Sequence, residues 1–172
     1  MAHHSSKFSG WLLVGIPILA IIGLIVWSAT RPNPGEKISN QGNRHLESET
    51  ESHEPYNFKP PTSGPHVGKA PWGVSSKQIP DEVQVHNLED GGVIVHYDPA
   101  KVTSSTIQEL EGTVKPFFLK GKNIILEPYA EMESPITVTA WTRMLKLPSA
   151  DAAAIEEFIN AYIGIDHHVR GQ

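Results

Sequence analysis

The 172-residue chain contains no cysteine. This absence excludes disulfides, zinc ribbons, iron–sulfur clusters, thiol nucleophiles and copper sites built on a thiolate. Any bound metal ion must therefore be held by histidine, methionine, carboxylate or backbone oxygen. Basic side chains are also scarce, since 14 Lys and Arg stand against 19 Asp and Glu, a net charge of −5. Because a nucleic-acid partner needs clustered positive charge, we expect no nucleic-acid binding.

Charge is absent from the segment that begins at Trp11 and ends at Trp27, WLLVGIPILAIIGLIVW. Extended to residue 29, this segment is nearly long enough to cross a hydrocarbon core of ~30 Å as a helix. A tryptophan at each end suits the two membrane interfaces. The sequence therefore predicts a short tail over residues 1–10 and a transmembrane anchor over residues 11–29 that contacts membrane lipid. A cleaved signal peptide, cut near Ser28, is the alternative.

The basic residues around this segment give little help with its orientation. Lys7 precedes it, while Arg31 and Lys37 follow it, so the positive-inside rule does not place the rest of the chain outside. A short polar amino terminus followed by one span nevertheless resembles a signal anchor. We therefore expect a single-pass protein of the cell membrane, with its carboxy-terminal domain outside the cytoplasm.

Large apolar residues are nearly absent from residues 30–54, which are rich in Pro, Asn, Gly, Ser and Glu. Such a segment cannot bury enough surface to offset the entropy of ordering, so it predicts a flexible linker. His45 and His53 lie in it and are interpreted as solvated histidines. The remaining residues, 55–172, are long enough for one folded domain with a single core.

The predicted domain combines strands and helices without a βαβ rhythm. Gly91 and Gly92 supply a turn between two valine-rich segments, and a stripe of apolar residues marks the last helix. The predicted strands are Val83–Leu88, Val93–Tyr97, Asn123–Glu127 and Pro135–Trp141. The first predicted helix is Thr103–Glu111, which Gly112 stops. The second is capped by Ser149, and its buried face carries Ile155, Phe158, Ile159, Tyr162 and Ile163. The fold class is α+β: a small, mainly antiparallel sheet with two helices, preceded by one transmembrane helix.

The register of the predicted hairpin decides whether two histidines face each other. A two-residue loop would pair His86 with Val95 and put the imidazoles of His86 and His96 on opposite faces. A three-residue loop, Asp90–Gly92, would instead pair His86 with His96 and collect the valines on the other face. We favour the second register because it segregates polar and apolar side chains better.

Facing histidines on a strand pair predict a metal site. Directly opposed residues hold their Cβ atoms roughly 4.5–5.5 Å apart, within reach of one ion, and His66 could close the set from a glycine-flanked loop. Met132, in the loop before the last strand, could add a thioether. A histidine site without cysteine favours copper first and zinc second. The alternative is a hydrogen-bonded pair of strand histidines with a structural role.

Two histidine blocks resemble a known family. The chain is similar to the bacterial domain of unknown function 3105 over roughly Tyr56 to Gly164. The resemblance is carried by Pro60–His66, by Val85–Val93 with His96 and Tyr97, by Ile136–Trp141 and by the closing helix. The resemblance implies one amino-terminal span and an outward-facing domain, and it implies no activity. The family pattern reads HNLEHGG, whereas this chain has Asp90 at the second histidine. If that position is a ligand, Asp90 would supply an oxygen donor.

These observations predict a membrane-anchored, extracytoplasmic metal-binding domain. Its candidate ligands are His66, His86, Asp90, His96 and Met132. The expected ion is copper, with zinc second. The domain would serve a respiratory or oxidase membrane complex. The alternative is a non-catalytic accessory subunit of a membrane protein complex whose histidines are structural. A third alternative is a hydrolase in which a His/Glu pair, such as His86 and Glu89, activates water. It is not favoured, because neither a G-x-S-x-G elbow nor an H-E-x-x-H helix motif occurs.

Overall fold

The computed structural model describes residues 15–23 and 31–168, and it divides into two compact units at residues 33 and 34. In the first unit, residues 15–23 form a helix. Within the described parts of the chain, no helix has the length and apolar character needed to cross a membrane. The predicted tail, residues 1–10, and the two ends of the predicted anchor, 11–14 and 24–29, lie outside the described residues.

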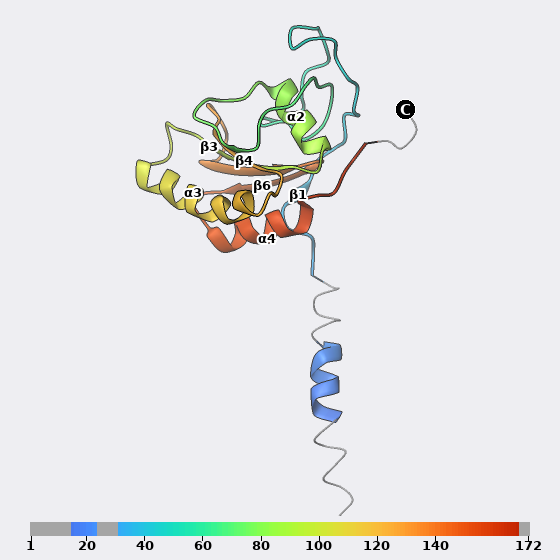
Figure 1. The fold of residues 1–172 in the computed structure, drawn as a ribbon, viewed down its shortest axis with the longest axis vertical. Helices are drawn as coiled ribbons and strands as arrows, with labels where there is room; N and C mark the ends of the chain where they lie inside the picture. Colours follow the sequence, from blue (N-terminus) through green and yellow to red (C-terminus); the bar gives the residue numbers. More distant parts are fainter. Residues whose placement is uncertain (1–14, 24–30, 169–172) are drawn as a thin grey trace, which may run out of the picture. The chain divides into compact units, whose positions relative to one another are not determined.

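The second unit is an α+β domain built on a mixed six-stranded sheet, ordered β1-β6-β5-β3-β4-β2 (Figure 1). Its strands are β1 (Glu36–Lys37), β2 (Gly73–Val74), β3 (Val93–Tyr97), β4 (Ile124–Pro128), β5 (Ile136–Ala140) and β6 (Arg143–Leu147). The β2–β4 and β3–β4 pairs are parallel, whereas the others are antiparallel. The prediction of a mainly antiparallel sheet was therefore wrong. The cause is the helix between β3 and β4, which returns the chain to the same end of the sheet and makes this pair parallel.

That connecting helix, α3 (Ser104–Leu119), begins where it was predicted, because the Thr103 side chain accepts the Thr106 N–H. It continues past Gly112, which does not stop it. Helix α4 (Ala152–Tyr162) is capped by Asp151 rather than Ser149, and it buries the predicted face. Helices α3 and α4 cover one face of the sheet (Figure 1), where the core collects Val93, Val95, Leu110, Val114, Ile124, Leu126, Val138, Ile155, Phe158 and Ile159.

The opposite face of the sheet is covered by a third helix, α2 (Asp81–Glu89). The prediction of a strand over Val83–Leu88 was wrong, and with it the hairpin and its paired histidines. Asp81 and Glu82 follow Pro80 in the first turn, where negative charge is favourable. The valine-rich pattern misled because nearly all of α2 is buried. The apolar side chains of α2 pack on the sheet. The polar side chain of Asn87 instead forms hydrogen bonds with the Ala70 backbone in an overlying loop.

Part of the segment predicted as a flexible linker is folded onto the domain. Glu36 and Lys37 form β1 and pair with β6, while Ile38 and Leu46 are buried. These are two of the few large apolar side chains between residues 30 and 54, and their burial ties the segment down. The prediction of a tether was therefore wrong for these residues. The chain that follows β1 crosses to the α2 side of the sheet, where it contributes to the site described next.

Candidate metal centre

His45 and His66 lie side by side, although 21 residues separate them in the sequence. A parallel bridge joins the two backbones: Leu46 N–H donates to the His66 carbonyl over 2.8 Å, and His66 N–H donates to the Arg44 carbonyl over 2.9 Å. The two imidazole centroids are 4.4 Å apart and their Nε2 atoms 3.3 Å apart. Backbone pairing, not side-chain packing alone, therefore fixes this pair.

The His66 ring is oriented by the glycine loop that carries it. Its Nδ1 lies 2.8 Å from the Gly64 carbonyl. A carbonyl only accepts, so Nδ1 carries the proton and donates it. In the neutral ring, Nε2 then presents a lone pair to the cluster, as in metal-binding histidines held by a carbonyl. Gly64 has φ +130, and a Cβ there would lie 2.9 Å from the Tyr56 ring, so this turn requires glycine.

Helix α2 brings His86 and Glu89 to the same place. Three residues apart on a helix, they share one face, and the His86 ring centroid lies 5.2 Å from that of His66. Burial lowers the pKa of His86, which favours the neutral, ligating form of the ring. Its Nδ1 is buried and has no hydrogen-bond partner among the described residues.

Glu89 is completely buried, and neither of its carboxylate oxygens accepts a hydrogen bond from any described residue. Its Oε2 nevertheless lies 2.9 Å from His66 Nε2 and 3.5 Å from His45 Nε2. Donors held about 2.1 Å from a tetrahedral ion are themselves roughly 3.4 Å apart. One ligand atom each from His45, His66, His86 and Glu89 lies within 4.8 Å of the others. The spacing fits four ligands around one ion.

The charge of Glu89 supports the same interpretation. A buried carboxylate without hydrogen bonds is costly unless a positive charge compensates it. A proton on one imidazole would compensate only one contact, whereas a divalent cation would bind the carboxylate and all three imidazole lone pairs together. The donor set therefore fits a metal ion.

A second group of donors adjoins the first, made of His86, Asp90 and His168. His168 follows α4 in the carboxy-terminal segment, which Figure 1 shows running from α4 towards the end of α2. Its Nε2 is 3.3 Å from Glu89 Oε2 and 3.8 Å from Asp90 Oδ1. Asp90 thus lies beside the cluster rather than among its four central donors.

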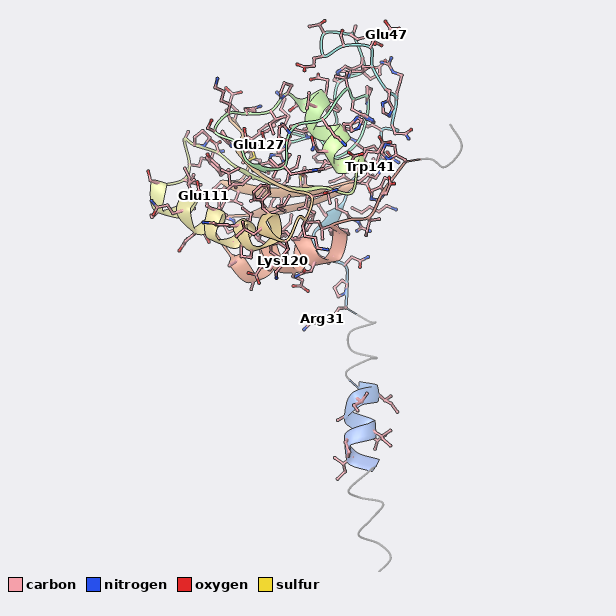
Figure 2. All side chains as sticks on the ribbon, viewed as in Figure 1. Arg31, Glu47, Glu111, Lys120, Glu127 and Trp141 are labelled. Atoms are coloured by element: carbon pink, nitrogen blue, oxygen red, sulfur yellow. The ribbon has the colours of Figure 1, made fainter. Side chains whose placement is uncertain are left out.

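His96 is not part of either group, contrary to the prediction. It points from β3 into the layer beneath α2, where its Nδ1 lies 3.0 Å from Glu127 Oε1 and its Nε2 2.9 Å from Thr139 Oγ1. Glu127 also accepts the Ile79 N–H. Figure 2 shows Glu127 well apart from Trp141, whose ring is the neighbour of His66. His96 therefore lies in the buried layer between the sheet and α2, apart from the histidine cluster.

Met132 also lies away from the cluster. Its side chain is buried in the loop between β4 and β5, and its carbonyl accepts a hydrogen bond from Lys101. That loop leads into Ile136, which pairs with Tyr97 at the end of β3. Asp90 precedes the start of β3, so the length of the strand, about 16 Å, separates the two regions. The structure gives no support to a thioether ligand.

Sequence reasoning did not name three contributors to the site as metal ligands: His45, Glu89 and His168. His45 was assigned to a solvated linker, although the apolar Leu46 beside it was a sign of burial. The spacing of His86 and Glu89 becomes informative only once the segment is known to be helical. Asp166 before His168 was an available sign, because a carboxylate that orients an imidazole is common around metal sites.

Comparison with known proteins identifies the family of the chain. The family described as "Protein of unknown function (DUF3105)" matches residues 47–170, and this range contains His66, His86, Glu89 and His168. His45 lies just before the matched range. No curated protein and no solved structure matches the chain.

Proposed function

Since the chain belongs to the DUF3105 family, for which no function is described, we propose from its own geometry that it is a metal-binding protein. Its domain binds one divalent transition-metal ion between His45, His66, His86 and Glu89. The observation that carries the proposal is Glu89: a buried carboxylate that faces imidazole nitrogens from three separate segments without a hydrogen bond.

The donor set favours copper(II), with zinc second. Imidazole nitrogens suit both ions, and among divalent first-row ions copper binds such sites most tightly. A thioether would shift the preference to copper(I), but Met132 lies elsewhere. Three histidines and one carboxylate also satisfy the tetrahedral preference of zinc. The choice between the two ions rests on affinity and on the ion that the cell supplies.

The proposal includes the location of the protein. An uncharged segment flanked by Trp11 and Trp27 supports a single membrane span. We place the metal-binding domain outside the cytoplasm because a short polar amino terminus before one span resembles a signal anchor. Such a domain, tethered to a membrane, would store copper or deliver it to a membrane protein complex such as a respiratory oxidase. The absence of cysteine fits a site that works without thiol chemistry.

Titration of the 172-residue chain in detergent with copper(II) and with zinc tests the proposal, each ion in the presence of a competing chelator. We expect one ion per chain, with nitrogen couplings from imidazole in the electron paramagnetic resonance spectrum of the copper form. His66→Ala should weaken binding by at least 10–100-fold. His53→Ala is the matched control, because His53 pairs with Glu82 outside the cluster. An unchanged affinity in the His66 variant would contradict the proposal.

A second candidate function is that of an accessory subunit of a membrane protein complex. It is favoured by an apolar groove of about 310 Å³ between β2 and α3, lined by Val74, Val114, Phe118 and Leu119. Val74 and Leu119 are more than half exposed, so this apolar surface is open to contact with a partner protein. Gentle detergent purification should then yield co-migrating subunits, and Leu119→Lys should release them. A chain that purifies alone would count against this candidate.

A further inference from the structure

The carboxy-terminal segment is fastened to the end of α2 by its backbone. Gly164 N–H donates to the Gly91 carbonyl over 2.7 Å, and His167 N–H donates to the Glu89 carbonyl over 2.9 Å. The His167 ring stacks on Trp141, with centroids 5.8 Å apart. These contacts bring His168 beside Glu89 and Asp90.

His168 is oriented as a metal ligand would be. Its Nδ1 lies 2.7 Å from Asp166 Oδ1. The carboxylate accepts the Nδ1 proton and turns Nε2 towards Glu89 and Asp90. The same hydrogen bond raises the pKa of His168, so a metal ion that binds at Nε2 must displace a proton from the charged ring. The same Asp166 oxygen accepts the His168 backbone N–H over 2.9 Å, which fixes the turn.

Burial and charge distinguish the two groups of donors. The side chains of His66 and Glu89 are fully buried, whereas that of His168 is 43% exposed. Lys69 Nζ lies 3.0 Å from Asp90 Oδ2, and this positive charge weakens the attraction of Asp90 for a cation. The outer group is therefore the more accessible and the weaker of the two.

We propose that His86, Asp90 and His168 form an outer metal position, through which a divalent cation passes on its way to and from the inner position. The inference rests on the proposed function. His86 belongs to both groups, and Glu89 Oε2 lies beside His168 Nε2. An ion can therefore move inward by exchanging Asp90 and His168 for His66 and Glu89, one ligand at a time. At no stage does it lose all of its protein ligands.

The kinetics of metal exchange in the 172-residue chain test this proposal. Zinc loading is followed by stopped flow, and release is followed after addition of excess chelator. An intermediate position lowers the barrier in both directions. His168→Ala should therefore slow loading and release together, on the order of 10-fold, while the equilibrium dissociation constant stays unchanged. Asp166→Asn keeps an oxygen that can accept from His168 but removes the negative charge beside the ring, so it should give a smaller effect of the same kind.

Two results would overturn the proposal. Faster release together with weaker affinity would make His168 a permanent ligand of the bound ion. Unchanged rates would place the entrance elsewhere, for example beside His45, whose side chain is 56% exposed. His53→Ala serves as the control and should leave both rates unchanged. If the wild-type chain binds no ion, the proposed function itself fails; if it binds an ion with rates that ignore His168, only the outer position fails.

Discussion

His66 Nε2 lies 2.9 Å from Glu89 Oε2, and both side chains are completely buried. The His66 proton is committed to the Gly64 carbonyl, so a lone pair faces a carboxylate. Two acceptors at this distance repel each other unless a positive charge lies between them. The pair therefore costs free energy in the ion-free protein and contributes to binding in the loaded one.

Glu89→Gln should separate these two effects. The variant loses the carboxylate ligand. Loss of a group that only orients a ligand costs about 10–100-fold in metal affinity, so loss of a ligand itself should lower the affinity for zinc or copper at least 100-fold. At pH 8, above the ordinary histidine pKa of about 6.5, the ion-free variant should be more stable than the ion-free wild type, by about 1–2 kcal/mol. Urea unfolding of ion-free and loaded protein measures both effects.

Glu127→Gln is the matched control for that experiment. Glu127 is equally buried and also lies against a histidine, His96, but its Oε2 accepts the Ile79 N–H, whereas Glu89 accepts no hydrogen bond from the described residues. Breaking a paired buried carboxylate should lower the stability of the ion-free protein and leave metal affinity unchanged. If the two variants behaved alike, Glu89 would be an ordinary buried carboxylate and the metal centre would lose its main support.

His96→Ala tests the assignment of His96 to the core. The change removes a side chain that bridges Glu127 and Thr139, and it leaves the Ile79 N–H as the partner of the buried Glu127 carboxylate. We expect a loss of about 3–5 kcal/mol of unfolding free energy. Metal stoichiometry, measured on the folded fraction at low temperature, should remain that of the wild type. A variant that folds normally but binds no ion would restore His96 as a ligand.

The sequence predicted those elements whose signals are local. Thr103 marks the start of α3, and the spacing of Ile155, Phe158 and Ile159 marks the buried face of α4. Strands β4 and β5 stood out as apolar runs of the right length. The family assignment, made from the two histidine blocks, is confirmed.

The site could not be assembled in the same way, because its ligands come from segments far apart in the sequence. His45 reaches His66 only through a backbone bridge, and His168 reaches Glu89 only after α4 has packed beneath the sheet. The error at α2 had a further physical cause: a helix buried on nearly all sides shows no amphipathic stripe, so its valine-rich sequence resembled a strand.

The stability of the ion-free protein should depend on pH through His86. Burial lowers the pKa of His86 below its ordinary value of 6.5, so near this pH the unfolded chain binds a proton that the folded domain resists. The stabilisation is fully present above pH 6.5 and is lost as the pH falls from there towards the lower folded pKa. His86→Gln should flatten this dependence by at most about 1.4 kcal/mol per pH unit.

Urea unfolding between pH 8 and 5.5, in the presence of a chelator, measures the difference between the two proteins. Burial also lowers the pKa of His167, whereas the hydrogen bond to Asp166 raises the pKa of His168 and that to Glu82 helps to raise the pKa of His53. These contributions have opposite signs and are common to both proteins, so the difference between the two pH profiles reports His86. A steeper dependence in the variant than in the wild type would show that His86 is stabilised by its proton, and this would contradict its role as a neutral ligand.

Gly91→Ala should damage the outer position without touching any ligand. Gly91 has φ +74, and an added Cβ would lie 2.8 Å from the Ile165 backbone nitrogen. The positive φ alone costs about 1–3 kcal/mol for a residue with a side chain, and the contact would push the carboxy-terminal segment away from α2. Metal exchange should then slow as it does in His168→Ala, while the inner affinity stays close to that of the wild type.

Gly112→Ala provides the opposite control for the stability measurement. Gly112 lies within α3, and a Cβ there would meet nothing within 4 Å. Alanine in a helix interior is favoured over glycine, so this variant should gain about 0.5–1 kcal/mol and exchange metal normally. Gly91→Ala should destabilise the domain and slow metal exchange, whereas Gly112→Ala should stabilise it and leave exchange unchanged. The two variants together therefore separate the effect of the position of the carboxy-terminal segment from that of the stability of the domain. Slowed exchange in both variants would mean that the rates follow stability rather than His168.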